Sequence, residues 1–115
     1  MDFQEELVKS LKKCPGLDGL IFVDPDGESI LYEGSIDDPF HLQLAGAKMP
    51  ILMGQYQSLD GSPTYMELQF EKEYVISIRL VDDYSITAIG SDLGKKGQIK
   101  SHLEELAVKF NQEIV

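Results

Sequence analysis

Few residues in this sequence have types and spacing suited to chemistry, and the most suggestive stretch is GSDLGKKG at residues 90–97. Phosphate-binding loops of the form G-x-x-x-x-G-K-[ST] also follow a strand and open a helix, because backbone N–H groups and a lysine then surround the phosphates. Here only three residues separate Gly90 from Gly94, and Lys96 stands where a hydroxyl would bind magnesium. The stretch therefore does not predict nucleotide binding.

The other reactive side chains stand alone in the sequence. Cys14 is the single cysteine, so no internal disulfide can form. His41 and His102 fall on different predicted helices, and neither has a second ligand at a spacing typical of metal sites. Arg79 lies on the polar face of a predicted strand, which favours an ion pair with a neighbouring carboxylate over a catalytic role. We expect no catalytic residue, no metal and no cofactor, although groups that only folding brings together are invisible at this level.

Composition limits the class of protein. A chain of 115 residues with 43% hydrophobic content suits one domain over residues 1–115 with a single core. The net charge of −10, from 20 acidic and 10 basic residues, disfavours nucleic acid and anionic membranes as partners. The chain has neither an apolar run long enough to span a membrane nor the pattern of a secretion signal. We therefore expect a soluble cytoplasmic protein.

Hydrophobic periodicity and turn residues predict an α+β fold. Apolar residues recur at helical spacing near both ends of the chain, and three stretches rich in β-branched and aromatic residues follow Pro63. DPDG at 24–27 has turn chemistry, and Asp37 or Asp38 can cap a helix that Pro39 begins. The predicted elements are a helix at 2–13, strands at 19–24 and 28–33, a helix at 39–57, strands at 64–70, 74–81 and 84–90, and a helix from 95 to the end. Short connections make the sheet largely antiparallel.

The second predicted helix is apolar on two sides. One side carries Phe40, Leu44, Ala47 and Ile51, and the other carries Leu42, Ala45, Met49, Leu52, Met53 and Tyr56. We expect the bulkier first set to pack on the sheet of the same domain. We expect the second set to face another chain, since small and methionine side chains allow close and adaptable packing. Pro50 should kink the helix or divide it in two.

The order of these elements, with GLDGLIFVDPDGESILY in the first hairpin, LAGA in the second helix and SDLG before the third, resembles the roadblock family of dynein light chains and bacterial GTPase regulators. The resemblance implies a roadblock/profilin-like fold, helix-β-β-helix-β-β-β-helix, with a five-stranded antiparallel sheet in the order 2-1-5-4-3. It places the second helix on one face of the sheet and the first and third helices on the other.

The resemblance also implies how the protein works. Family members form dimers in which third strands pair edge to edge, here through Tyr65, Met66, Glu67, Leu68 and Gln69, while second helices pack antiparallel. Members of the bacterial MglB type bind a small Ras-like GTPase across the paired second helices and accelerate hydrolysis without an arginine finger. Carried over by position, Ala45, Met49, Met53 and Tyr56 become the candidate contact face. Together with Leu42 and Leu52 on the same side of the helix, they form the predicted partner or dimer interface.

These observations favour a non-catalytic, homodimeric regulator or adaptor of a small Ras-like GTPase that modulates GTP hydrolysis. The alternative is a structural scaffold or assembly subunit, formed by a roadblock homodimer or heterodimer that does not regulate a GTPase. A third possibility, an enzyme or small-ligand sensor, would require a deep polar pocket.

Overall fold

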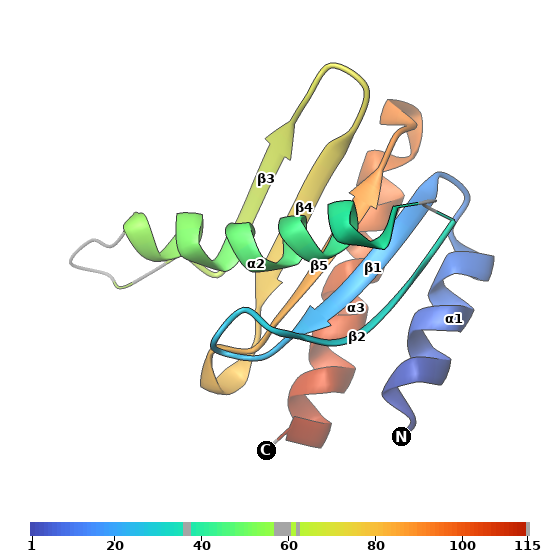
Figure 1. The fold of residues 1–115 in the computed structure, drawn as a ribbon. Helices are drawn as coiled ribbons and strands as arrows, with labels where there is room; N and C mark the ends of the chain where they lie inside the picture. Colours follow the sequence, from blue (N-terminus) through green and yellow to red (C-terminus); the bar gives the residue numbers. More distant parts are fainter. Residues whose placement is uncertain (36–37, 57–60, 62, 115) are drawn as a thin grey trace.

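The computed structural model describes residues 1–35, 38–56, 61 and 63–114. Within them the chain forms, in order, α1 (Phe3–Lys13), β1 (Leu17–Val23), β2 (Ser29–Gly34), α2 (Pro39–Gln55), β3 (Tyr65–Gln69), β4 (Tyr74–Arg79), the 3₁₀ turn η1 (Val81–Asp83), β5 (Ser85–Gly90), the 3₁₀ turn η2 (Leu93–Lys95) and α3 (Lys96–Ile114) (Figure 1). This order confirms the prediction, while Gln57, the last residue of the predicted second helix, lies outside the described residues. None of the described helices is long and apolar enough to cross a membrane.

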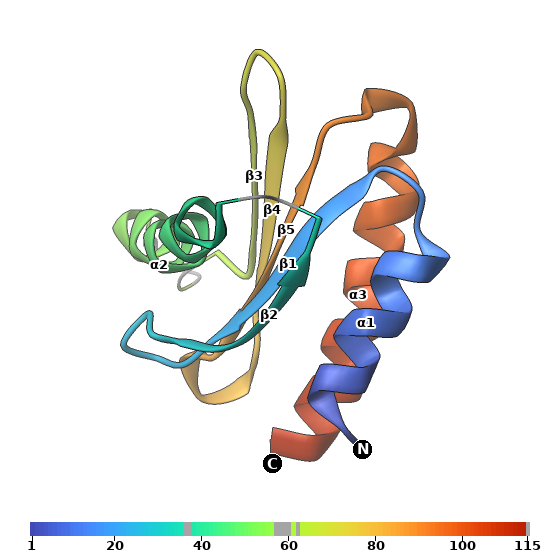
Figure 2. The ribbon, with the colours of Figure 1, turned by 45° about the vertical axis from the view of Figure 1, so that its right-hand side comes forward.

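The five strands form one sheet in the order β2-β1-β5-β4-β3, and all neighbouring strands run antiparallel. Helix α2 lies across one face of the sheet, and α1 and α3 lie side by side on the other (Figure 2). Strand order, strand direction and helix placement all agree with the expectation from the roadblock resemblance. The strand β3 is at the edge of the sheet and pairs with β4 alone among the described strands.

The larger core fills the space between the sheet and the pair α1 and α3. At its centre the rings of Phe3, Phe22 and Phe110 meet with centroid separations of 4.7 to 5.3 Å. The apolar residues that recur at helical spacing near the end of the chain are buried here, namely Ile99, Leu103, Leu106 and Phe110. Aromatic contacts of this kind add to the stabilisation from buried area, so this layer holds both ends of the chain on the sheet.

Helix α2 begins as the sequence predicts. Pro39 is its first residue, and the Asp38 carboxylate accepts a hydrogen bond from the Phe40 backbone N–H at 3.0 Å. Asp37, the other predicted cap, lies outside the described residues. The helix then runs without interruption through Pro50 to Gln55, so of the two alternatives expected from Pro50, a kink or a division of the helix, the division is wrong. Residues before and after the proline remain packed on the sheet, and this packing compensates for the lost backbone hydrogen bond.

The face of α2 that packs on the sheet has glycine at its centre. A Cβ atom at Gly46 would lie 2.9 Å from Cγ2 of Ile21 and 3.1 Å from Cγ1 of Val23. Since contacts this short are not tolerated, glycine at this position lets α2 approach β1 closely. The smaller core forms around this contact and contains Ile21, Val23, Leu42, Met49, Val75 and Ile89.

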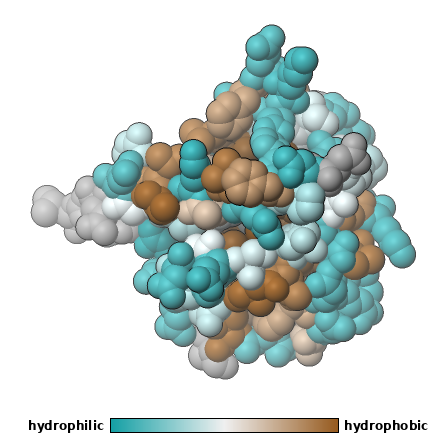
Figure 3. Space-filling model, viewed as in Figure 1, coloured by the Kyte–Doolittle hydropathy of each residue, from teal (hydrophilic) through white to brown (hydrophobic). Residues whose placement is uncertain are grey.

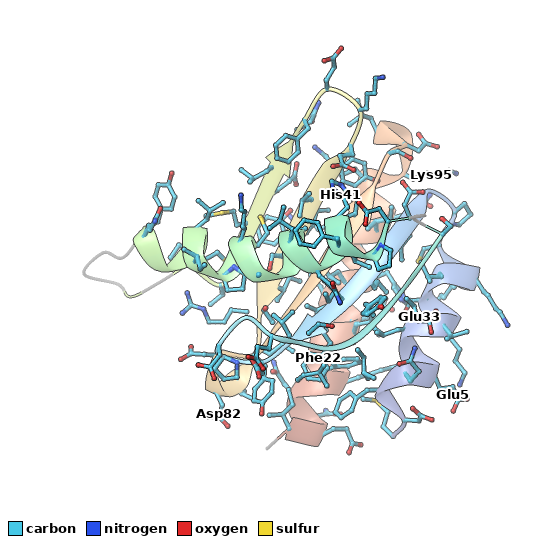
Figure 4. All side chains as sticks on the ribbon, viewed as in Figure 1. Glu5, Phe22, Glu33, His41, Asp82 and Lys95 are labelled. Atoms are coloured by element: carbon cyan, nitrogen blue, oxygen red, sulfur yellow. The ribbon has the colours of Figure 1, made fainter. Side chains whose placement is uncertain are left out.

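The turn between β4 and β5 has an unusual backbone. Asp82 and Asp83, the predicted two-residue connection, have φ angles of +55° and +64°. Among residues with a side chain, aspartate is one of the few that adopts this left-handed region readily. The turn carries Asp82 to the outer end of the β4–β5 hairpin (Figure 4).

Candidate partner-binding surface

The face of α2 that packs on the sheet is the one the sequence analysis assigned to another chain. Leu42 and Met49 are each 2% exposed, and Met53 is fully buried. These three residues therefore cannot form a free partner surface, and their assignment is wrong. The physical reason is the position of Gly46, which shares their side of the helix and allows the close approach to β1 that large side chains on the other side would prevent.

The side chains expected to hold α2 on the sheet instead face outward. Phe40 is 64%, Leu44 38% and Ile51 62% exposed. We call these three residues the outer stripe. Ala47, assigned to the same set, is half-buried and lies beside Gly27 in the β1–β2 turn. Three exposed large apolar side chains on one helix are typical of a surface that another molecule covers.

Ala45, Leu52 and Tyr56 remain available to a partner. Ala45 and Leu52 are half-buried, and Tyr56 is 65% exposed at the end of α2. Ala45 and Leu52 line a mainly apolar hollow of about 370 Å³ between α2 and the β3–β4 hairpin. The hollow continues along β3 into a second one, which Leu52 and Tyr56 line together with Met66 and Leu68.

We call these two hollows together the α2–β3 groove. Its lining comprises His41, Leu44, Ala45, Lys48, Met49, Leu52, Tyr56, Met66, Glu67, Leu68, Phe70, Glu73 and Val75. Nε2 of His41 lies 2.8 Å from Oε1 of Glu73, which ties the start of α2 to the hairpin. Figure 3 shows apolar side chains gathered along α2 and between α2 and β3 on this face.

The open edge of β3 adjoins the α2–β3 groove. The N–H of Arg79 donates to the Thr64 carbonyl at 2.9 Å, and the N–H of Phe70 donates to the Glu73 carbonyl at 2.7 Å. In an antiparallel ladder this alternation directs the backbone groups of Tyr65, Glu67 and Gln69 away from β4. The predicted edge strand is therefore an edge in the structure, with three residues whose N–H and C=O groups can pair with another strand.

The side chains of these edge residues are held on the α3 side of the sheet. The Glu67 carboxylate accepts hydrogen bonds from Nζ of Lys96 at 2.5 Å and from the Tyr65 hydroxyl at 2.7 Å. The Lys96 hydrogen bond is the main cause that lowers the pKa of Glu67. Nζ of Lys100 lies 4.5 Å from the centroid of the Tyr65 ring. These contacts fix the side chains, and the ladder with β4 keeps the edge backbone in an extended conformation suited to pairing.

In the glycine-rich stretch before α3, the side chain of Asp92 contacts the backbone of the stretch itself. Oδ1 of Asp92 accepts a hydrogen bond from the Gly94 N–H at 3.0 Å, and the Tyr74 hydroxyl donates to the Asp92 carbonyl at 3.1 Å. A carboxylate therefore stands at the backbone N–H where a phosphate would bind. The Asp92 side chain thus caps the turn η2 that precedes α3.

Folding brings Ser10, His102 and Glu105 together in an order that resembles a catalytic triad. Nε2 of His102 is 2.7 Å from Oγ of Ser10, and Nδ1 lies 4.0 Å from Oε2 of Glu105. However, the Ser10 hydroxyl donates to the Glu6 carbonyl at 2.7 Å, and Ser10 is 1% exposed. Because the hydroxyl is buried and already donates its proton, it presents no nucleophile to a substrate. Sequence separation hid this cluster, which links α1 to α3.

The remaining reactive residues fit structural roles. Cys14 is buried, and burial raises the pKa of its thiol, so the nucleophilic thiolate is disfavoured. Within the part of the chain that the structure describes, no three histidine, cysteine or carboxylate side chains are grouped to hold a metal. The expected ion pair of Arg79 is not formed with any described residue, because its neighbours across the sheet are Thr64 and Ser85.

Comparison with known proteins defines the class of fold. No protein-family model matches the sequence, and no curated protein matches it. Among solved structures, the chain is similar to a roadblock/LC7 domain from Streptomyces avermitilis, with a TM-score of 0.79, 11% identity, and 99% of this chain and 98% of that chain covered. It is also similar to MglC from Myxococcus xanthus, with a TM-score of 0.74, 15% identity, and coverage of 98% and 99%.

Myxococcus xanthus MglB is a third similar structure, with a TM-score of 0.67, 19% identity, and 97% of this chain and 99% of that chain covered. The three alignments span nearly the whole of each protein, and the strand order of this chain is the one that the roadblock resemblance implies. The chain therefore has the roadblock/LC7 fold. The expected resemblance to roadblock and MglB-type proteins is confirmed at the level of the fold.

Proposed function

We propose that this chain is a non-catalytic, homodimeric regulator of a small Ras-like GTPase in the bacterial cytoplasm, and that it modulates GTP hydrolysis. The observation that carries the proposal is the continuity of the open β3 edge with an apolar groove and an exposed stripe on α2. The likeness to MglB and MglC supports the choice of a GTPase as the partner.

The first step of the proposal is the dimer. Edge strands are usually blocked by charge, proline or a covering element, because unpaired backbone groups invite association. Here Tyr65, Met66, Glu67, Leu68 and Gln69 form an edge that only β4 borders among the described strands. Pairing β3 with a second copy satisfies these groups and brings two α2–β3 grooves together. A twofold interface of about 1,000 to 2,000 Å² is then expected.

Helix α2 contributes to the dimer through the predicted residues that remain accessible, Ala45, Leu52 and Tyr56. They share the groove with Met66 and Leu68 of β3. A second copy that extends the sheet across β3 also covers this groove, since the groove borders that edge. The apolar lining then moves from water into a protein contact, which is the main driving force for association.

The second step is the GTPase surface. Phe40 and Ile51 point away from the sheet that α2 covers, and Leu44 is exposed where the outer stripe meets the α2–β3 groove. The outer stripe is therefore placed to contact a third molecule. With a net charge of −10, this chain associates faster with a partner whose docking face is basic. Since no histidine or arginine on α2 lies in the outer stripe, the proposed effect on hydrolysis acts through the GTPase's own catalytic groups.

The test uses the purified chain and a Ras-like GTPase encoded in the same genome. We expect the chain to bind the GTP-loaded form and to change its single-turnover hydrolysis rate. The variant Ile51→Glu should weaken both effects by about tenfold or more, because it puts a charge into an apolar contact. Val108→Glu puts the same charge at an exposed apolar site on α3, on the other face of the sheet (Figure 2), so it is the matched control and should retain both effects.

The scaffold alternative gives a different result. A chain that dimerises normally, or pairs with a second roadblock chain, yet neither binds nor alters any such GTPase would contradict the regulator and favour the scaffold. Binding that Ile51→Glu and Val108→Glu weaken equally would contradict the assignment of the outer stripe.

A further inference from the structure

A third hollow, separate from the α2–β3 groove, lies on the opposite side of α2 under the C-terminal half of the helix. Its lining is Pro25, Pro50, Met53, Gly54, Arg79, Asp83 and Ser85, and its volume is about 300 Å³. We call it the α2–η1 cavity, since α2 and the turn η1 border it. This volume is at the small end of pockets that bind small molecules.

The floor of the α2–η1 cavity carries a serine hydroxyl without a hydrogen-bond partner and an arginine without an ion pair among the described residues. Arg79 and Ser85 are directly paired across β4 and β5, so their Cβ atoms lie about 4.5 to 5.5 Å apart on the same face of the sheet. Ser85 is 1% exposed, and its Oγ is the buried side-chain polar atom without a hydrogen-bond partner among the described residues. Arg79 is half-buried and forms no ion pair there.

This pair of groups is suited to a carboxylate. The guanidinium presents several N–H donors in a planar fork that matches two carboxylate oxygens, and the serine hydroxyl can donate a further bond. A buried hydroxyl without a partner costs free energy, and a ligand oxygen removes this cost. Met53 and Arg79 are long, unbranched side chains whose rotamers can change to admit the carboxylate to the covered hydroxyl.

The rim of the cavity has the opposite charge. Asp83 lines it, and Asp82 is its chain neighbour on the exposed turn, while Asp24 and Asp26 flank the lining residue Pro25. A ligand with only negative charge is repelled by these carboxylates. A ligand that carries an ammonium group beside its carboxylate is attracted at both ends.

We propose that the α2–η1 cavity binds a small zwitterion of the α-amino acid class. Its carboxylate lies on Arg79 and Ser85, and its ammonium group faces Asp83. This is a ligand-sensing site in addition to the proposed partner surface and does not depend on it. The bound molecule contacts Pro50 and Met53 of α2, so ligand binding also affects the helix that carries the outer stripe.

The experiment is an NMR titration of the isotope-labelled full chain with three matched probes. L-Alanine has both charged groups, propionate lacks the ammonium group, and ethylamine lacks the carboxylate. We expect L-alanine to shift the Arg79 side-chain, Ser85 and Gly54 signals with saturation at millimolar concentration or below. Propionate should bind about tenfold more weakly, and ethylamine and inorganic phosphate should not saturate.

Three variants locate the site. Arg79→Gln should weaken L-alanine binding by about tenfold or more, because it removes the charged fork. Asp83→Asn should weaken L-alanine binding while leaving propionate binding equal or tighter. Asp82→Asn, the matched control on the same turn, keeps a residue type that accepts a positive φ and should change affinity by less than about twofold.

Several outcomes would overturn the proposal. Equal affinities for L-alanine and propionate would show that Asp83 does not bind the ammonium group. If L-alanine shifts NMR signals all over the surface, or if the shifts do not saturate, L-alanine does not bind in the cavity. Unchanged binding by Arg79→Gln with a native spectrum would remove the carboxylate site.

Discussion

Replacing Glu67 by proline is expected to convert the proposed dimer into folded monomers. In the β3–β4 ladder the backbone N–H of Glu67 points to the open edge rather than to β4. Proline at this position therefore removes no backbone hydrogen bond of the single chain, and proline is tolerated on edge strands for this reason. Within the chain, only the carboxylate contacts of Glu67 with Lys96 and Tyr65 are lost.

The expected magnitude follows from the symmetry of that pairing. If the twofold axis passes through Glu67, the two Glu67 residues face each other and exchange two N–H···O bonds. Both are lost in Glu67→Pro, at about 1 kcal/mol each. The proline rings also crowd the opposite carbonyls, so the total is about 2 to 3 kcal/mol. The dimer dissociation constant then rises by a factor on the order of 30 to 150.

Glu67→Ala is the control for this change. It loses the same carboxylate contacts with Lys96 and Tyr65 but keeps the backbone N–H. Sedimentation equilibrium over a range of concentrations measures the association constant of each variant against the calculated monomer mass of 12.9 kDa. Far-UV circular dichroism verifies that the proline variant is folded.

One result would refute the reasoning. A folded Glu67→Pro chain that dimerises as tightly as Glu67→Ala shows that β3 does not pair edge to edge. If the wild-type chain is monomeric at micromolar concentration, the proposed dimer is disproved.

Two other predictions follow from burial. Met49→Arg should lower the free energy of unfolding by about 3 kcal/mol or more in urea denaturation, because it buries an unpaired charge. The control Ile51→Arg, at an exposed site, should stay within about 0.5 kcal/mol of wild type. Equal effects of the two variants would disprove that Met49 faces the sheet. The pKa of His102 is lowered, first by burial of the imidazole and second by the positive charge of Lys13. The unfolded chain therefore binds more protons, and the stability from neutral His102 is lost as the pH falls from its ordinary value of about 6.5 through the lowered one. In denaturation curves at pH 7 and 5, His102→Gln should reduce the difference in the free energy of unfolding between the two pH values. An unchanged difference would contradict the role of His102.

The fold was predictable because its signals are local and agree with one another. The turn at DPDG, the cap at Asp38 and the apolar stripe of α3 each specify an element, and their order matches the roadblock pattern. The face of α2 that packs on the sheet was predicted wrongly, although the sequence contains the signal for it. His41, Lys48 and Gln55 repeat every seven residues and are all exposed, so the arc opposite them had to face the sheet.

The candidate sites depended more on tertiary structure. The edge residues of β3 could be named in advance because strand order follows from the family pattern. The α2–η1 cavity could not, since it joins Pro25, Pro50 and Asp83 from distant parts of the chain. Only the strand register shows that Arg79 has a serine rather than a carboxylate opposite it.

The two layers on the sheet differ in size, and this difference sets an order of opening. Among the described residues, the cluster beneath α2 has six buried apolar side chains, whereas the cluster beneath α1 and α3 has fifteen. Local opening requires the least free energy where the least apolar surface is buried. Amide hydrogens of α2 should therefore exchange with solvent before those of α3 and the central strands. Since α2 carries both the outer stripe and the roof of the α2–η1 cavity, a molecule bound at either place should slow that exchange.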